Sequence, residues 1–169
     1  MTIERALPED ANVLADFFIG HITRYSDYIS HGEIQMGVGT GELRDGVFVT
    51  SPAPDAREKW LKYINFHITA EGEAGVWKLT DGGEICGFCV ADIEEDGDEP
   101  FGVVCDVLVR EGYRGRGAGA KLLQTAVSWL RSKGIKDIYL ESGKDNHAAH
   151  RFFEKRGFVH VSNIYKLGR

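Results

Sequence analysis

The chain has 169 residues, of which 43% are hydrophobic and 27% are charged, and its formal net charge at pH 7 is −6. This length suffices for one domain with a core of its own, and no apolar run approaches the ~18 residues that a membrane span needs. The acidic balance argues against nucleic acid as a partner, because binding a phosphate backbone needs clustered Lys and Arg. Charged residues and a proline interrupt the N-terminus early, so we expect no signal peptide and a cytoplasmic location.

The first half of the chain predicts a strand over residues 3–7, followed by a helix for which Asp10 is the N-cap. Apolar residues then recur at helical spacing. Residues 31–51 are rich in glycine and predict a long loop, of the kind that is usually functional or mobile. A second helix is expected from about Pro54, because proline is well tolerated at a helix start. We expect Trp60 and Trp77 to lie in the core.

The second half predicts mostly strands. Residues 76–80 and 85–93 flank a glycine turn and indicate an antiparallel hairpin. The acidic stretch 94–100 is expected to be a solvated loop, and a strand follows over 101–109. Helices are expected over 121–133, capped by Gly134, and over 146–155, with strands over 138–141 and 159–167. This order favours a mixed sheet packed by helices.

The three cysteines are Cys86, Cys89 and Cys105. An odd number without an export signal indicates reduced thiols. Cys86 and Cys89 form a C-x-x-C, but in a strand residues three apart face opposite sides of the sheet. We therefore expect buried structural thiols and no metal site.

A glycine-rich turn over residues 112–119 joins the strand 101–109 to the following helix. Unpaired N–H groups and partial positive charge at a helix N-terminus attract phosphate, and glycine allows the backbone to approach it closely. Arg114, Arg116 and Lys121 add positive charge. The turn is therefore predicted to bind a phosphate ligand.

Three phosphate motifs compete for this turn. The Walker A pattern fails, because leucine follows Lys121 where serine or threonine is required. The dinucleotide pattern matches from Gly115 to Ala120, with Glu141 ending a strand about 20 residues later. However, a dinucleotide domain places this turn after its first strand and needs several further strand–helix units. The third pattern, Arg/Gln-x-x-Gly-x-Gly/Ala, is met by Arg114, Gly117 and Gly119.

Residues 140–158 carry a second signature, in which a strand is followed by Asn146, Ala149, an aromatic residue, Glu-Lys and Gly-Phe. With both signatures, the chain resembles the GNAT N-acetyltransferase superfamily. The resemblance implies a single α+β domain over residues 1–169. Its mixed central sheet would have about six or seven strands, an antiparallel N-terminal hairpin, splayed central parallel strands and about four helices.

The resemblance also implies the reaction: direct attack of an amine on acetyl-CoA in a ternary complex, with a base to deprotonate the ammonium and with no metal. Asn146 is expected near the thioester and Phe153 beside the sulfur, while strand backbone binds the pantetheine arm and turn amides bind the pyrophosphate. The implied cofactor-binding residues are Val107, Leu108, Val109, Arg114, Gly115, Arg116, Gly117, Ala118, Gly119, Ala120, Asn146 and Phe153.

Phe153 departs from the family pattern, which commonly has a tyrosine acid there. Ser142, His150 and Tyr165 are alternatives, or coenzyme A leaves as a thiolate, since a thiol pKa is about 8.5. A histidine that only packs or caps is a competing interpretation for His150.

Asp106 resembles an aspartate of relatives that act on small amines such as polyamines, where it would bind the ammonium and assist its deprotonation. The alternative is an Asp that bonds backbone or pairs with an Arg. The acceptor wall is expected to include Tyr25, Tyr28, His31 and Glu33.

The expected acceptor is the primary amine of a small cationic molecule. Two alternatives stay open: acetylation of a protein or peptide amine, and a non-catalytic acetyl-CoA-binding module. The sequence gives no firm sign of a homodimer.

Overall fold

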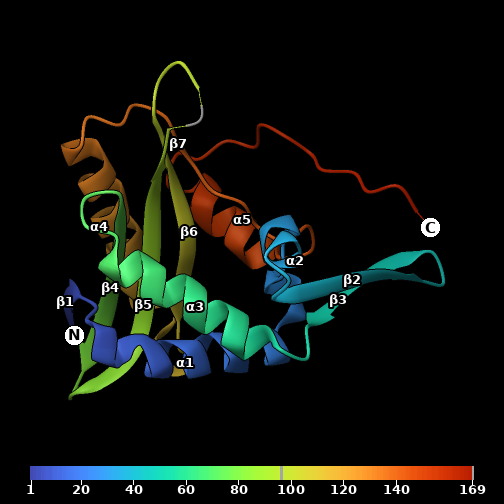
Figure 1. Ribbon diagram of the computed structural model, residues 1–169, viewed down its shortest axis with the longest axis horizontal. Coiled ribbons are helices and arrows are strands. Elements are labelled where there is room, and N and C mark those ends of the chain that lie inside the picture. The colour runs from blue at the N-terminus through green and yellow to red at the C-terminus, as the bar shows by residue number, and fades with distance from the viewer. Residues whose placement is uncertain (96, 169) are drawn as a thin grey trace. The chain divides into compact units, whose positions relative to one another are not determined.

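The computed structural model describes residues 1–95 and 97–168 (Figure 1). The strands are β1 Thr2–Arg5, β2 Gly39–Arg44, β3 Val47–Pro52, β4 Ala74–Asp81, β5 Glu84–Glu94, β6 Phe101–Val109 and β7 Ile138–Tyr139; the α-helices are α1 Ala11–Arg24, α2 His31–Gln35, α3 Ala56–Thr69, α4 Ala118–Ser132 and α5 His147–Glu154. The chain divides into two compact units, Met1–Phe18 with Trp60–Leu140, and Ile19–Lys59 with Glu141–Arg169.

The first unit contains a five-stranded sheet in the order β1-β4-β5-β6-β7. Neighbouring strands are antiparallel except β6 and β7, which are parallel. The expected hairpin forms as β4 and β5, and β6 has the expected bounds. A mixed sheet with helices is thus confirmed, with the seven strands shared between this sheet and a separate two-stranded one.

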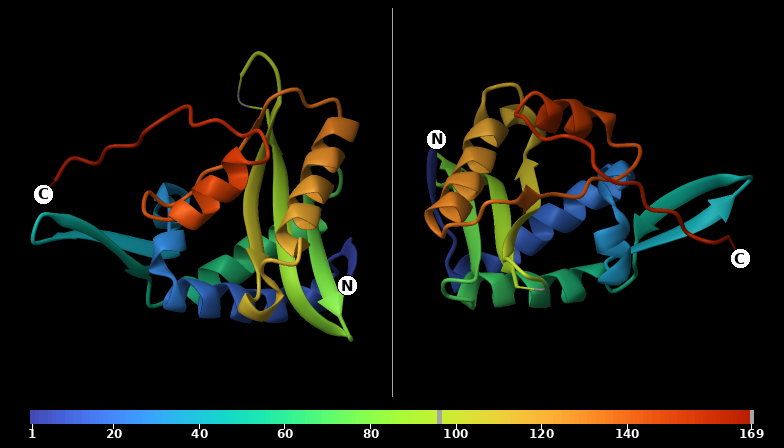
Figure 2. Two further views of the ribbon diagram at one scale, coloured as in Figure 1. Left: turned by 180° about the vertical axis from the view of Figure 1, so that it is seen from behind. Right: turned by 90° about the horizontal axis from the view of Figure 1, so that it is seen from above.

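Helices pack on both faces of this sheet. On one face, the ring of Phe88 lies 5.6 Å from that of Trp60 of α3. On the other, the Cys89 thiol donates to the carbonyl of Leu122 of α4, at 3.3 Å. Figure 2 shows α4 along this second face. Trp60 and Trp77 are buried, as expected, and β5 is apolar along most of its length because both of its faces are covered.

Cys86 and Cys89 are buried free thiols with different backbone partners. Burial raises the pKa of the Cys89 thiol, which keeps it protonated and unreactive. Among residues 1–95 and 97–168, no group of three or more His, Cys, Asp or Glu is placed to hold a metal ion. In the same residues, no helix is long and apolar enough to cross a membrane.

The prediction that Asp10 is the N-cap of the first helix is wrong. Pro8–Asp10 form a 3-10 turn that leads into α1, and the Asp10 carboxylate accepts the N–H of Leu7, at 2.8 Å. The N-cap is therefore Leu7, three residues earlier, and the Asp10 carboxylate accepts its backbone N–H.

The prediction of a long loop over residues 31–51 is wrong. In the second unit these residues form α2 and the β2–β3 hairpin. Asp45 and Gly46, at the hairpin turn, both have positive φ, 49° and 78°. Asp-Gly is the residue pair that such a two-residue turn favours, because both positions require positive φ. The signal was present in the sequence, but the surrounding glycines hid it.

The strand predicted over residues 159–167 is also wrong. Apolar side chains such as Val159 and Leu167 alternate there, but they are 77% and 92% exposed. A strand needs a neighbouring edge for its backbone hydrogen bonds, and neither sheet includes these residues. They form the extended C-terminal segment visible in Figure 2.

Candidate active site

The glycine turn has the geometry of an anion site. A 3-10 turn, Glu111–Tyr113, follows β6, and Gly115 and Gly117 then adopt φ of 74° and 80°. Gly117 is the N-cap of α4, so no cap side chain occupies the first amides of the helix. A side chain added at Gly115 or Gly117 would meet nothing within 4 Å. The start of α4 thus has no capping side chain, and the space beside the two glycines is open, as phosphate binding requires.

Two arginines of this turn are exposed. The Arg114 Nε donates to the carbonyl of Val109, at 3.1 Å, which fastens the turn to the end of β6. The Arg116 guanidinium lies 5.9 Å from the centre of the Tyr113 ring. Positive charge therefore surrounds the amides and favours an anion further.

Strand β6, which leads into the turn, is paired with β7 only near its beginning. β7 pairs only with Gly102 and Val103 of β6. In the part of the chain that the structure describes, the remainder of β6 has a strand partner on the β5 side alone. Val107, Leu108 and Val109 lie in this stretch, although the Val109 carbonyl is already taken by Arg114. This splay leaves an edge of backbone groups directly before the turn.

A β-bulge interrupts β6 beside this edge. Asp106 lies opposite Val90 of β5, and two residues earlier Val104 lies opposite Ala91, so Cys105 is an extra residue in the register. Bulges of this kind re-aim side chains and are common next to active sites. Asp106 is only 4% exposed.

The bulge brings Asp106 against helix α3. The hydroxyl of Tyr63 donates to Asp106 Oδ2, at 3.1 Å. The two structural roles considered for Asp106, bonding backbone or pairing with an arginine, do not describe this contact. Burial raises the pKa of the Tyr63 hydroxyl well above its ordinary value, and the negative charge of Asp106 raises it further, so the phenol stays protonated.

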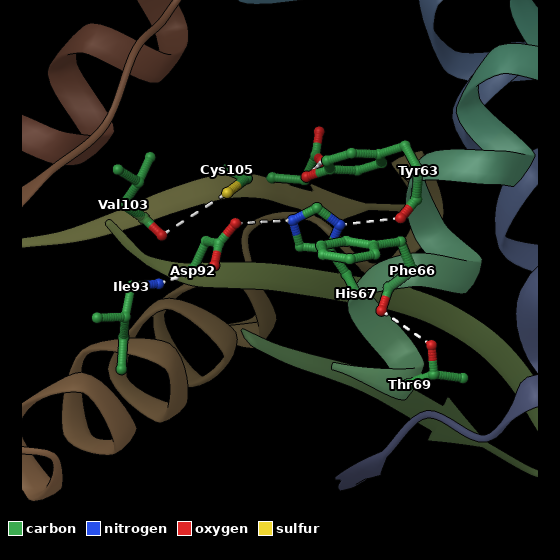
Figure 3. A network of polar contacts seen from close by, with 9 residues as sticks. Tyr63, Phe66, His67, Thr69, Asp92, Ile93, Val103 and Cys105 are labelled. Carbon is green, nitrogen blue, oxygen red and sulfur yellow. Dashed lines mark hydrogen bonds and ion pairs between the residues drawn. The ribbon is translucent and has the colours of Figure 1, made fainter. Parts of the chain in front are cut away.

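One helical turn further along α3, His67 contacts a second carboxylate, that of Asp92 (Figure 3). Its Nδ1 lies 2.9 Å from the Tyr63 carbonyl oxygen and its Nε2 lies 3.0 Å from Asp92 Oδ2. Burial of the ring opposes protonation, but these hydrogen bonds and the charges of Asp92 and Asp106 together raise the His67 pKa. The other oxygen of Asp92 accepts the N–H of Ile93, at 2.8 Å.

The sequence interpretation missed Tyr63, His67 and Asp92. The signal for His67 was its position, because it follows Trp60 and Ile64 at intervals of four and three, on the buried side of the helix. The signal for Asp92 was a carboxylate inside an apolar strand. A polar group in such a place needs a partner, but only the fold shows which one it finds.

The second unit holds the remaining predicted residues. Asn146 is the N-cap of α5, where its side chain accepts the N–H of Ala149, at 3.2 Å. His150 Nε2–H donates to the carbonyl of Gly143, at 2.9 Å, so this histidine ties the start of α5 to the preceding loop. Ser142 is half-buried in that loop. Phe153 packs against Phe158, with ring centres 6.0 Å apart.

Glu33 also has a structural role. Its carboxylate accepts both the N–H and the hydroxyl of Ser30, at 2.7 and 2.6 Å, and so caps α2. Burial raises the Glu33 pKa, while the Ser30 hydrogen bonds act in the opposite direction. His31 lies beside Glu141, with Nδ1 3.7 Å from its carboxylate.

Tyr25 and Tyr28 flank one histidine. Their rings lie 5.1 and 5.2 Å from that of His21. Both side chains are half-buried. The structure thus brings these two predicted residues together around His21.

Residues 42–158 match the model of the acetyltransferase (GNAT) family. The chain belongs to this family. It is thus an acetyl-CoA-dependent N-acetyltransferase. Its seven strands, parallel β6–β7 pair and glycine turn are therefore those of a GNAT fold, and acetyl-CoA is the cosubstrate.

Two relatives and one solved structure are similar to this GNAT protein over most of its length. N-alpha-acetyltransferase 30 of Schizosaccharomyces pombe is 26% identical over 114 residues, which cover 66% of this chain and 75% of that protein. The ribosomal protein bS18-alanine N-acetyltransferase of Escherichia coli is 26% identical over 117 residues, 69% of each chain. A predicted acetyltransferase from Clostridium acetobutylicum, solved with acetyl-CoA, superposes with a TM-score of 0.72 at 15% identity, over 99% of this chain and 95% of that one.

Proposed function

We propose that this GNAT protein transfers the acetyl group of acetyl-CoA to the primary amine of a small cationic molecule, with Asp106 binding the ammonium. The buried carboxylate of Asp106 carries this proposal. It lies on a bulge of β6, the strand that ends in the glycine turn, and a buried carboxylate is a strong site for a cation when geometry allows the two to pair.

The amides of residues 114–119 would bind the pyrophosphate of acetyl-CoA, although the Arg114 N–H already donates to the carbonyl of Glu111. The β6 backbone at residues 107–109 would bind its pantetheine arm. Support comes from the positive φ of Gly115 and Gly117, the exposed arginines, and the lack of a β7 partner along this part of β6. Asn146 and Phe153 stay predictions from the family resemblance, as do Ser142 and His150 as catalytic groups and Tyr25, Tyr28 and Glu33 as acceptor contacts.

The reaction then needs one deprotonation and one displacement. Asp106 attracts the ammonium and takes up its proton, directly or through water, which frees the nitrogen lone pair. The nitrogen attacks the acetyl carbonyl, the new C–N bond forms, and the C–S bond breaks. Because the phenyl ring of Phe153 has no proton to give, coenzyme A leaves as a thiolate, which a thiol pKa of about 8.5 permits.

We also propose that residues 1–169 form a single acetyltransferase domain. The family match from residue 42 to residue 158 includes segments of both compact units. A chain truncated after residue 140, which lacks the second stretch of the second unit, is therefore expected to give no turnover.

Replacing Asp106 by Asn tests the proposed role. The amide keeps the size of the side chain and still accepts the Tyr63 hydroxyl, but it neither attracts an ammonium nor takes its proton. We expect kcat to fall by about 100-fold or more, while the Kd for acetyl-CoA by calorimetry stays unchanged. The exposed Asp137→Asn is the control and should retain the wild-type rate. A wild-type rate in Asp106→Asn would remove Asp106 from the mechanism.

A protein N-terminus is the second candidate acceptor, and two of the relatives favour it, because one is named an N-alpha-acetyltransferase and the other an alanine N-acetyltransferase of a ribosomal protein. A panel of diamines, polyamines and aminoglycosides beside short peptides with free N-termini separates the two. Higher kcat/KM for peptides would replace the small-amine proposal. Tight acetyl-CoA binding without turnover of any acceptor would indicate a non-catalytic module.

A further inference from the structure

Four side chains connect helix α3 to the bulge of β6. Tyr63 and His67 lie one turn apart on α3, Asp92 lies on β5 and Asp106 on β6. Figure 3 shows the His67 imidazole between Asp92 on one side and the carbonyl of Tyr63 on the other. The order of contacts is therefore Asp92, His67, Tyr63 and Asp106.

The geometry requires His67 to be an imidazolium. Its Nδ1 faces a carbonyl oxygen and its Nε2 faces a carboxylate oxygen, and neither oxygen can donate a hydrogen bond while Asp92 is ionised. The other oxygen of Asp92 accepts the N–H of Ile93. Both ring nitrogens must therefore carry a proton, and the charge of His67 balances that of Asp92.

The imidazolium in turn fixes Tyr63. The two rings lie 4.1 Å apart between centres, at 47°. The hydrogen bond from Nδ1 to the Tyr63 carbonyl ties the ring to the backbone that carries the phenol. Since His67 is only 6% exposed, it has little room to move. The phenol is thus held where its hydroxyl donates to Asp106.

We propose that Tyr63 is a positioning residue for Asp106, held in place by the His67–Asp92 ion pair. By donating to Oδ2, Tyr63 fixes the plane of the carboxylate and favours its ionised form, which is the form that binds an ammonium. This inference rests on the proposed function, in which Asp106 meets the acceptor amine.

Other groups also act on Asp106 and have to be weighed in its titration. The titratable groups that interact with Asp106 come from three elements: Tyr63 and His67 of α3, Cys89 of β5 and Cys105 of β6; Asp92 of β5 acts on His67 and Cys105. The Cys105 thiol interacts with both the Tyr63 hydroxyl and Asp106, and burial raises its pKa, so it stays neutral. Tyr63 is the neutral donor to Asp106 that a single-atom change can remove.

Tyr63→Phe removes only this hydroxyl. Hydrogen bonds to charged groups are worth about 1.5–3 kcal/mol, so kcat/KM is expected to fall by roughly 10-fold or more. The acid limb of the variant's profile of kcat/KM against pH should also move to higher pH, because the ionised carboxylate of Asp106 loses a hydrogen-bond donor. The Kd for acetyl-CoA should stay unchanged. Tyr139→Phe, on the exposed ring of β7, is the matched control and should leave both the rate and the profile as in the wild type.

A double-mutant cycle separates positioning from mere structure. If Tyr63 acts through Asp106, Tyr63→Phe should cost nothing further in the Asp106→Asn background, and Asp92→Asn should move the acid limb in the same direction as Tyr63→Phe. A full, additive loss in that background, or an unmoved pH profile in Tyr63→Phe, would overturn the inference while leaving the role of Asp106 intact. A wild-type rate in Asp106→Asn alone would instead overturn the proposed function and, with it, the inference.

Discussion

Buried polar residues decide the chemistry that this GNAT protein offers, and each is held by a specific partner. Asp106, His67 and Ser30 are the buried polar or charged residues of the described chain. Each has a recorded hydrogen-bonding partner, as burial of a polar group requires. Ser30 caps a helix, whereas Asp106 and His67 meet other titratable side chains.

The His67–Asp92 pair should make stability depend on pH. The folded-state pKa of His67 is raised above 6.5, so the folded chain binds this proton more tightly than the unfolded chain does. The stabilisation is therefore complete below about pH 6.5 and is lost as pH rises through the folded-state value. We expect wild type to exceed Asp92→Asn by about 1–3 kcal/mol in free energy of unfolding at pH 5.5, and by less at pH 8.5.

Urea denaturation of both proteins at several pH values measures this difference. Asp98→Asn, an exposed carboxylate, serves as the control and should show no such trend. A difference that is constant from pH 5.5 to 8.5 would mean that His67 is not an imidazolium in the folded protein.

Helix α4 begins and ends at glycines, but only its first turn is proposed to bind the cofactor. Gly117 begins it and Gly134 follows it, with φ of 80° and 81°, and a Cβ at either would meet nothing within 4 Å. The cost of a side chain at each position is therefore conformational rather than a matter of space. The two glycines form a matched pair at opposite ends of the helix.

Gly117→Ala and Gly134→Ala should each lower the free energy of unfolding by about 1 kcal/mol. Only Gly117→Ala is expected to weaken acetyl-CoA binding, by several-fold or more, since it alone moves the amides proposed to bind the pyrophosphate. Calorimetric titration with acetyl-CoA, beside denaturation of both variants, tests this. Equal affinities in the two variants would show that the pyrophosphate binds elsewhere.

At the scale of the whole molecule, cofactor binding should raise thermal stability. A ligand that binds only the folded chain stabilises it by about 2.7 kcal/mol at 100 times its Kd. For a chain of this size we expect acetyl-CoA to raise Tm by roughly 5–10 °C. NADH at the same concentration should not, because the turn lacks the further strand–helix units of a dinucleotide domain. A larger shift with NADH would revive the dinucleotide interpretation that the sequence also allowed.

The sequence by itself determined the family, the glycine turn after β6 and most of the elements around it. Those features depend on local chemistry: glycine at positive φ, apolar residues at helical spacing, and a strand directly before a helix. Strand 101–109 and its turn were predicted correctly for this reason, and Asp45-Gly46 could have revealed the β2–β3 hairpin as well.

Only the tertiary structure decided what Asp106 touches. Tyr63 and Asp106 lie 43 positions apart, and they meet because a bulge in β6 turns the carboxylate toward α3. The pattern of residues in β6 is compatible with a regular strand, and nothing local marks Cys105 as the extra residue. Likewise, the alternating apolar residues near the C-terminus form no strand, because pairing depends on a neighbouring edge that the segment's own sequence does not specify.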